Sequence, residues 1–186
     1  MNRRPKPTVL MVPGLRDHVP GHWQTLLEAR IPGARSVPPL ETDKLSRAAR
    51  VAELERSLRS IDGPVVLVAH SAGVMITVHW ARDHHREIAG ALLVTPPDFA
   101  CPLPDGYPAR AALEANGWLP SPTARLPFPS IVCASRNDPL AQFDVVAAMA
   151  RGWGSRLVDL GEVGHLNPAA GYGEWPGAEA LIQELT

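Results

Sequence analysis

One serine in this sequence stands where its hydroxyl could do covalent chemistry. An apolar run over residues 65–69 leads directly into Ala69-His70-Ser71-Ala72-Gly73, and an apolar helical pattern follows at once. This order is typical of a serine at the tip of a tight strand-to-helix turn, where the hydroxyl is exposed. Such a turn strains the backbone, so the residues two positions before and after the serine must be small. Ala69, in place of the commoner glycine, and Gly73 meet this need, and we predict that Ser71 is a nucleophile.

A base and an acid follow this serine in the chain. A serine hydroxyl is a weak nucleophile near neutral pH, so it needs a base within hydrogen-bond reach and a third group that orients the base. The chain provides Asp138 and then His165, each behind a predicted strand, in the order that this kind of turn uses. Asp98 is a rival for the acid, but the two prolines before it restrict its loop. We predict that Ser71, Asp138 and His165 act together.

Two backbone amides are candidates for stabilising the negative oxygen that an attacking serine creates. One is the N–H of Ala72, directly after the serine and at the start of a helix whose dipole favours negative charge. The other should come from the loop behind the first strand, Val12-Pro13-Gly14-Leu15. We predict that the Leu15 N–H has this role, so that the backbone of Leu15 matters and its side chain is incidental.

Strand and helix signals alternate along the chain around these residues. Short apolar runs predict strands, of which the second is the weakest, over 8–12, 34–37, 65–69, 88–94, 130–134 and 156–160. Helical spacing of apolar residues predicts helices over 21–30, 46–61, 72–84, 140–151 and 175–185. Nearly continuous apolar strands between helices indicate an α/β fold with a mostly parallel central sheet covered on both faces. No linker or internal repeat divides the chain, so we expect a single domain over residues 1–186.

A proline-rich segment over residues 96–129 interrupts this alternation. Its many prolines exclude regular sheet and leave room for at most one short helix near 109–116. The segment follows the carboxyl end of a strand, which is where ligands bind in open α/β sheets. Its aromatic residues therefore either face a substrate or pack on the core, and both interpretations stay open. Phe99 and Trp118 are the candidates for substrate contact.

Composition and charge favour an ordinary globular protein over a binder of nucleic acid or membrane surfaces. The 186 residues are 45% hydrophobic and 20% charged, with a formal net charge of −1. The apolar run after the basic start is too short for a signal peptide, and no stretch is long enough to span a membrane. Two cysteines without metal-ligand spacing fit a reducing compartment, so we expect a cytoplasmic protein. No sequence pattern predicts a cofactor, and His18 and His22 straddle Pro20-Gly21, which disfavours a metal site.

Several motifs together resemble the small α/β-hydrolases of the retinoblastoma-binding serine hydrolase type. The matching motifs are Val12-Pro13-Gly14, Pro20-Gly21-His22-Trp23-Gln24, Ala69-His70-Ser71-Ala72-Gly73, Asn137-Asp138-Pro139 and Gly164-His165-Leu166-Asn167, and the second is the most family-specific. The resemblance covers nearly the whole chain. It implies an α/β-hydrolase-like three-layer sandwich without a large cap domain, with Ser71, Asp138 and His165 as a catalytic triad. It also implies carboxylesterase or related acyl-hydrolase activity.

The sequence departs from this family pattern in two places. Arg16-Asp17-His18-Val19 stands where smaller residues are common, and we expect Arg16, Asp17 and His18 to shape the mouth of the site and to contact substrate. The Leu-x-Cys-x-Glu motif with which the human relative binds the retinoblastoma protein is absent around both Cys101 and Cys133. No such protein partner is therefore expected.

One function fits these residues best, and two alternatives stay open. The first is a serine hydrolase that acts on small or short-acyl ester or thioester substrates through an acyl-enzyme. A non-catalytic binding or interaction protein on the same fold is the second, and the complete set of three catalytic residue types argues against it. The third is an acyl transferase, which shares the acyl-enzyme and differs in the acceptor that reaches it. The expected partner is a small acyl substrate.

Overall fold

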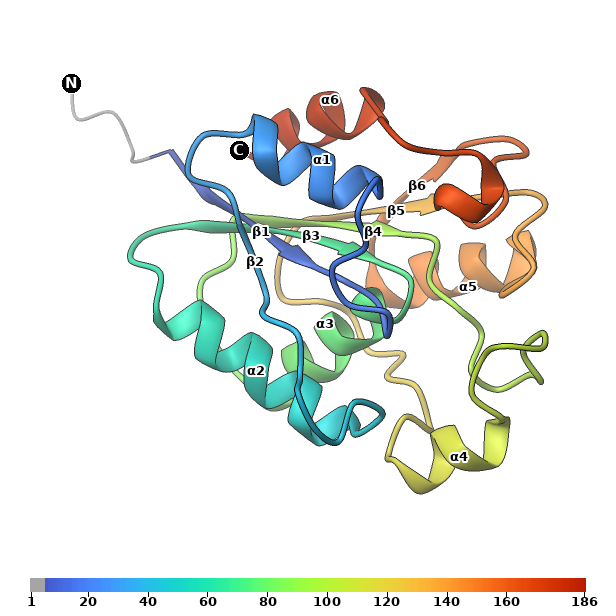
Figure 1. Cartoon of the computed structure of the whole chain (residues 1–186). Coiled ribbons are helices and arrows are strands. Elements are labelled where there is room, and N and C mark those ends of the chain that lie inside the picture. Colours follow the sequence, from blue (N-terminus) through green and yellow to red (C-terminus); the bar gives the residue numbers. More distant parts are fainter. Residues whose placement is uncertain (1–5) are drawn as a thin grey trace.

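A sheet of six parallel strands forms the centre of the computed structural model, which describes residues 6–186 (Figure 1). The strands are β1 (Thr8–Val12), β2 (Arg35–Ser36), β3 (Val65–His70), β4 (Gly90–Val94), β5 (Ser130–Ala134) and β6 (Arg156–Asp159). Their order in the sheet is β2-β1-β3-β4-β5-β6, so β3 is an inner strand between β1 and β4. The domain predicted over residues 1–186 begins with five residues that lie outside the described part of the chain.

The inner strands are buried on both faces of the sheet, which is why their sequences are almost continuously apolar. Along β1, Leu10 and Val12 belong to the core on one face, whereas Val9 and Met11 belong to the core on the other. The residues of β3 are all buried and alternate in the same way. This alternation follows from the two-residue period of a strand. The core thereby fixes where each strand ends, and with it the position of the residues that follow.

Helices cover both faces of the sheet and make three layers (Figure 1). They are α1 (Trp23–Arg30), α2 (Arg47–Arg59), α3 (Ala72–Asp83), α4 (Arg110–Ala115), α5 (Phe143–Trp153) and α6 (Gly177–Gln183), with the short 3-10 helix η1 (Pro168–Ala170). The core of one face takes its helical side chains from α1 and α6, and that of the other face takes them from α2, α3, α4 and α5. Over residues 6–186, no helix has both the length and the apolar character that a membrane crossing requires.

The predicted α/β architecture is confirmed, including its parallel sheet and its weak second strand, and the differences lie at the ends of elements. β2 has only two residues. The helix predicted over 140–151 begins later, at Phe143, because the Asp138 carboxylate accepts the Leu140 N–H (2.9 Å) and holds a turn there. Residues 6–186 contain no cap domain, and the segment 96–129 contributes only α4 and loops.

α3 starts directly beneath the end of β1, and this close approach requires a glycine. A Cβ atom on Gly73 would lie 2.0 Å from the Val12 carbonyl oxygen and 2.9 Å from that of Pro13. Packed interiors leave no room for such contacts, so any side chain would push α3 away from β1. Gly73 is therefore the small residue that the sharp turn at Ser71 demands.

We predict that Gly73→Ala destabilises the protein by about 3 kcal/mol or more, because the added methyl group must displace α3 from β1. Urea-induced unfolding followed by circular dichroism measures this loss as a change in the free energy of unfolding. The control is Gly33→Ala, since Gly33 has a positive φ of 77° but open space around its Cβ position. The control should lose only about 1 kcal/mol. Equal losses in the two variants would contradict the steric argument.

Candidate active site

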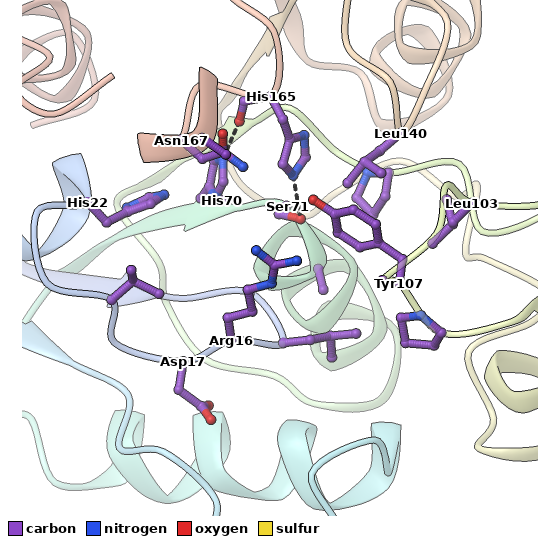
Figure 2. Close-up of a pocket in the computed structure, with 18 of the residues that line it drawn as sticks. Arg16, Asp17, His22, His70, Ser71, Leu103, Tyr107, Leu140, His165 and Asn167 are labelled. Carbon is purple, nitrogen blue, oxygen red and sulfur yellow. Dashed lines mark hydrogen bonds between the residues drawn. The ribbon is translucent and has the colours of Figure 1, made fainter. Parts of the chain in front are cut away.

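Ser71 lies at a strained turn between β3 and α3. Its backbone has φ 57° and ψ −128°, a region that residues with a Cβ atom rarely adopt. The turn is held from both sides, because the Ser71 N–H donates to the Val94 carbonyl (2.9 Å) and the Ser71 carbonyl accepts from the Val74 N–H (2.9 Å). Ser71 lines a cavity at the carboxyl edge of the sheet (Figure 2). The residue predicted as the nucleophile therefore faces open space.

His165 connects Ser71 to Asp138 through hydrogen bonds. The Ser71 Oγ and the His165 Nε2 are 2.8 Å apart (Figure 2), and the His165 Nδ1 lies 2.9 and 3.0 Å from the two Asp138 carboxylate oxygens. A carboxylate only accepts hydrogen bonds, so Nδ1–H donates to Asp138 and Nε2 accepts from the Ser71 hydroxyl. Both partners are enclosed, since 4% of the His165 side chain and 2% of the Asp138 side chain are exposed. Residues from three separate loops thus meet in the order hydroxyl, imidazole, carboxylate.

The loops that carry His165 and the acid are tied to each other by side-chain hydrogen bonds. The Asn137 Oδ1 accepts the Gly164 N–H (2.6 Å), and the Ser135 hydroxyl oxygen accepts the Val163 N–H (3.2 Å). The backbone of His165 is held as well, because the His70 Nε2–H donates to its carbonyl oxygen (2.8 Å; Figure 2). The imidazole is therefore positioned by the contacts of its own loop as well as by its carboxylate partner.

The two backbone amides predicted as oxyanion donors belong to residues that line the cavity at Ser71. Gly14, which precedes Leu15, lies so close that a Cβ atom on it would be 3.3 Å from the Ser71 Cβ and 3.6 Å from the Ala72 nitrogen. The Gly14 carbonyl accepts from the Asp17 N–H (3.0 Å), and the Leu15 N–H of the same trans peptide points the opposite way. In the described part of the chain, neither the Leu15 nor the Ala72 N–H donates to a protein acceptor. Both amides are therefore available to a bound oxygen.

A buried ion pair beneath this loop fixes the backbone of Leu15. Arg50, on α2, is only 5% exposed and pairs with the Asp17 carboxylate. The same guanidinium donates from Nη2 to the Leu15 carbonyl (3.1 Å) and from Nε to the Lys44 carbonyl (2.9 Å). The fork of N–H donors in an arginine suits this divided role. The orientation of the Leu15 backbone therefore depends on one buried cation.

The cavity in front of Ser71 has a volume of about 410 Å³, which lies within the range of small-molecule sites. Much of its wall is apolar and comes from Leu15, Leu45, Phe99, Leu103, Tyr107 and Leu140. Three charged residues, Arg16, Asp17 and Lys44, line it as well. The cavity thus combines an apolar pocket with a few charges, as sites for small organic substrates commonly do.

The two aromatic residues predicted to contact substrate have different places. Phe99 lines the cavity. Trp118 does not line the cavity, because its side chain is completely buried in the core. Its ring packs edge-to-face against Phe99, with ring centres 5.3 Å apart, and its indole N–H donates to the Leu45 carbonyl (2.7 Å). Trp118 therefore supports the cavity wall from behind and is not placed to touch a substrate.

Of the three polar residues predicted at the mouth of the site, two line the cavity and one does not. Arg16 and Asp17 line the cavity, although the Asp17 carboxylate points away from Ser71 toward α2 (Figure 2). His18 is not part of the wall, because its side chain lies 43% exposed with Nδ1 3.8 Å from the Glu28 carboxylate. The structure thus places His18 on the outer surface rather than against a substrate.

The proline-rich segment 96–129 serves both of the purposes that the sequence left open. Its first part lines the cavity through Pro97, Phe99, Leu103, Gly106, Tyr107 and Pro108. Its second part is anchored in the core through Leu113, Trp118, Leu126 and Phe128. Asp98, the rival for the acid, is engaged within its own loop, where its carboxylate accepts the Ala100 N–H (3.0 Å). The structure brings Asp138, and not Asp98, to His165.

Sequence reasoning missed several residues that shape the site, among them Lys44 and Leu140 in the cavity wall and Arg50 behind it. A signal for Arg50 was present, because it precedes Leu54 and Leu58 at helical spacing on the buried face of α2. An arginine on such a face is buried only when it has a partner. Lys44 and Leu140 lie in loops, where no periodic pattern marks the residues that face a cavity.

Three histidine rings form a row beside the cavity. The ring centres of His22 and His70 are 4.6 Å apart, and those of His70 and His165 are 4.9 Å apart. Burial, with smaller contributions from His165 and His18, lowers the pKa of His22 to about 4, and burial also lowers the pKa of His70 well below its ordinary value. His22 and His70 are therefore neutral near pH 7. Across residues 6–186, no group of three or more His, Cys, Asp or Glu side chains is placed to hold a metal ion.

The fold and this geometry together define the class of the protein. A parallel sheet with a serine at the turn behind an inner strand, and a histidine and an acid behind later strands, is the architecture of an α/β-hydrolase. More narrowly, the chain belongs to the serine hydrolase family, whose family model matches residues 9–184.

Solved structures of other hydrolases resemble this chain over nearly its whole length. A protein described as a YdeN-like hydrolase from Pectobacterium atrosepticum is 31% identical, with 96% of this chain and 89% of that chain covered and a TM-score of 0.81. The ydeN gene product of B. subtilis is 18% identical, with 97% and 98% covered and a TM-score of 0.76. N-formylmaleamic acid deformylase from Pseudomonas putida S16 shares the fold at 16% identity, with 98% and 93% covered and a TM-score of 0.68. Among curated proteins, none matches the sequence.

Acid is expected to destabilise the fold through its buried neutral histidines. Burial lowers the pKa of His79, on α3, to about 4, as it does for His22, whose Nδ1 caps α1 by accepting the Gln24 N–H (3.2 Å). A histidine in the unfolded chain has a pKa of about 6.5 and binds a proton that the folded state excludes, so stability is complete above about pH 6.5 and falls toward about pH 4. Each histidine contributes on the order of 1–3 kcal/mol over this window.

Urea unfolding at a series of pH values across this window measures the effect. His79→Gln should flatten the decline of stability with falling pH, because one proton-excluding site is gone. His85→Gln is the control, since His85 is exposed and should leave the slope as it is in the wild type. A slope that is the same in His79→Gln and in the wild type would contradict the assignment.

Proposed function

We propose that the protein is a carboxylesterase-like acyl hydrolase for small or short-acyl esters or thioesters, with Ser71, His165 and Asp138 as its catalytic triad. The observation that carries this proposal is the hydrogen-bonded series from Asp138 through His165 to Ser71 at the edge of a cavity. Membership of the serine hydrolase family supports the reaction class. The largely apolar wall suits a short acyl chain.

In this reaction His165 acts first as a general base. Its Nε2 takes the hydroxyl proton while the Ser71 Oγ forms a bond to the carbonyl carbon, and the carbonyl electron pair moves to oxygen. Asp138, bonded to Nδ1–H, stabilises the imidazolium. The carbonyl then re-forms, the bond to the leaving alcohol or thiol breaks, and His165 gives this group the proton. Water repeats the sequence on the acyl-serine, releases the carboxylic acid and restores the hydroxyl.

The oxyanion of each tetrahedral intermediate is held by the Leu15 and Ala72 N–H groups in this proposal. Both amides belong to residues that line the cavity beside Ser71, and both lack a protein acceptor in the described part of the chain. Ala72 also begins α3, whose dipole favours negative charge at this end. Loss of one such donor typically costs about 2.7–4 kcal/mol of transition-state stabilisation.

We also propose that the protein is of the retinoblastoma-binding type within the serine hydrolase family. The motif Pro20-Gly21-His22-Trp23-Gln24 favours the retinoblastoma-binding type of small serine hydrolase. In this chain its members stabilise the fold around the site. The Gln24 side-chain amide donates to the Val68 carbonyl (2.9 Å), and the buried Trp23 ring packs edge-to-face against the rings of His70 and Trp175. We also propose that the whole chain acts as one domain, because both cores are built on one sheet.

Labelling with a fluorophosphonate probe, read by intact mass, tests the proposed nucleophile. We expect one adduct on the wild type and none on Ser71→Ala, because the probe reacts only with an activated serine. His165→Ala should slow labelling by about 10²-fold or more, since the general base is lost. Ser60→Ala, an exposed serine behind α2, is the control and should label like the wild type.

Hydrolysis of an aryl butyrate by the same variants tests the reaction. Turnover should follow labelling across the series, with Asp138→Asn also impaired because the imidazole loses the acceptor that orients it. A folded wild type that neither labels nor turns over the ester would contradict the proposal and favour a binding protein. Labelling with acyl transfer to an added alcohol in place of hydrolysis would favour the transferase alternative.

The buried Arg50 predicts a second effect on turnover. Arg50→Met should lower kcat for the aryl ester about tenfold or more with little change in KM, because the Leu15 amide loses its support. The double variant Arg50→Met/Asp17→Asn removes the stranded buried carboxylate and should recover stability but not kcat. Both are assayed at a temperature at which circular dichroism shows them folded. An unchanged kcat in the folded double variant would show that Leu15 is oriented without Arg50.

A further inference from the structure

Within the described part of the chain, the cations of the cavity wall have no carboxylate partner. Arg16 and Lys44 line the cavity, and within residues 6–186 neither forms an ion pair. Asp17 is the acidic residue of the described wall, and its carboxylate is engaged by the buried Arg50. His22 and His70 are uncharged near pH 7, because burial lowers the pKa of each. The wall therefore carries positive charge that the protein itself does not neutralise.

Arg16 is held where it can meet a bound ligand. Its side chain rises from the loop behind β1 toward Ser71, on the side opposite His165 (Figure 2). The guanidinium carbon lies 5.2 Å from the centre of the Tyr107 ring, so the planar group rests against an aromatic face. This contact limits the freedom of a long side chain and leaves its N–H edges free. A planar guanidinium with free N–H edges matches a carboxylate, which it binds through two parallel hydrogen bonds.

We propose that the preferred substrates are half-esters or half-thioesters of short dicarboxylic acids, whose free carboxylate pairs with Arg16. This inference rests on the proposed function. The leaving group must lie toward His165, which gives it a proton, and Arg16 lies on the other side of Ser71 (Figure 2). The anionic group therefore belongs to the acyl part of the substrate, with its methylene groups against the apolar wall. Lys44 adds a second positive charge to the same cavity.

Arg16 acts in this scheme by binding alone. Its guanidinium forms hydrogen bonds to the substrate carboxylate and takes part in no bond-making or bond-breaking step. The triad cleaves the ester C–O or thioester C–S bond, water supplies the hydroxyl group, and the products are a dicarboxylate and an alcohol or thiol. Arg16 is thus a substrate-positioning residue, whose removal should impair turnover of charged substrates much more than turnover of neutral ones.

A matched pair of methyl esters tests this inference. Monomethyl glutarate carries the carboxylate, and the methyl ester of glutaramic acid replaces it with an amide of similar shape. We expect the wild type to prefer the glutarate ester by about tenfold or more in kcat/KM, mostly through KM. Arg16→Gln should remove most of the preference, leaving only the part that Lys44 supplies, and Arg16→Lys should retain more of it because the charge remains. Arg56→Gln, which removes a 71% exposed charge on α2, is the control and should behave like the wild type.

The position of the charge is tested with a third ester, carboxymethyl butyrate, which carries the carboxylate on the alcohol side. Equal or better turnover of this ester than of monomethyl glutarate would overturn the inference, as would an undiminished preference for glutarate in Arg16→Gln. Fluorophosphonate labelling and turnover of the aryl butyrate by the wild type report on the proposed function independently. A wild type that labels and turns over the aryl ester but shows no preference for glutarate would contradict this inference and leave the proposed function standing.

A binding measurement tests the pairing of Arg16 with a carboxylate without relying on turnover. Calorimetric titration of glutarate into Ser71→Ala protein should show binding that weakens about tenfold when Arg16→Gln is added. High ionic strength should weaken it as well, because salt screens a partly exposed pair. Glutarate that does not bind, or that binds equally well without the Arg16 charge, would overturn the inference.

Discussion

The contact between the start of α3 and the end of β1 is the constraint on which the site depends. Gly73 lets the helix backbone approach the Val12 carbonyl, where a Cβ atom would be only 2.0 Å away. With the helix so close, the chain must leave β3 through a sharp turn, and Ser71 takes a positive φ of 57°. The strain is offset by the burial of β3 and α3 on both sides. The same turn exposes the Ser71 hydroxyl and leaves the Ala72 N–H without an intrahelical partner.

Because the strands of the sheet are parallel, the residues that follow different strands lie together at one edge of the sheet. β5 and β6 are adjacent and run parallel to β3, so the loops that follow them leave the sheet at the edge that Ser71 occupies. Asn137 joins these two loops by accepting the Gly164 N–H, which brings His165 within hydrogen-bond reach of Asp138. Backbone hydrogen bonds of the sheet therefore set the coarse positions of Ser71, Asp138 and His165, and a few side-chain bonds set their fine positions.

Much of the fold and three central residues of the site could be predicted because local sequence determines them. Ser71, Asp138 and His165 each follow a strand whose apolar run is unambiguous, and the small Gly73 marks the turn. The environment of Trp118 could not be predicted, because segment 96–129 has no periodic pattern and its packing depends on distant parts of the chain. The partner of Arg50 was hidden for the same reason, since Asp17 lies in a loop far from α2 in sequence.

The loop from Gly14 to Asp17 determines both the orientation of the Leu15 amide and the positive charge of the cavity. A buried Arg50 alone would place an uncompensated positive charge under the cavity, and a free Asp17 would oppose negative charge in it. Their pairing cancels both effects and at the same time holds the Leu15 backbone. Because Asp17 is engaged inward, the charge of its neighbour Arg16 is left to the cavity. Asp17 therefore supports the proposed oxyanion site and Arg16 gives the cavity a positive charge, while neither takes part in the hydrogen-bonded series of Ser71, His165 and Asp138.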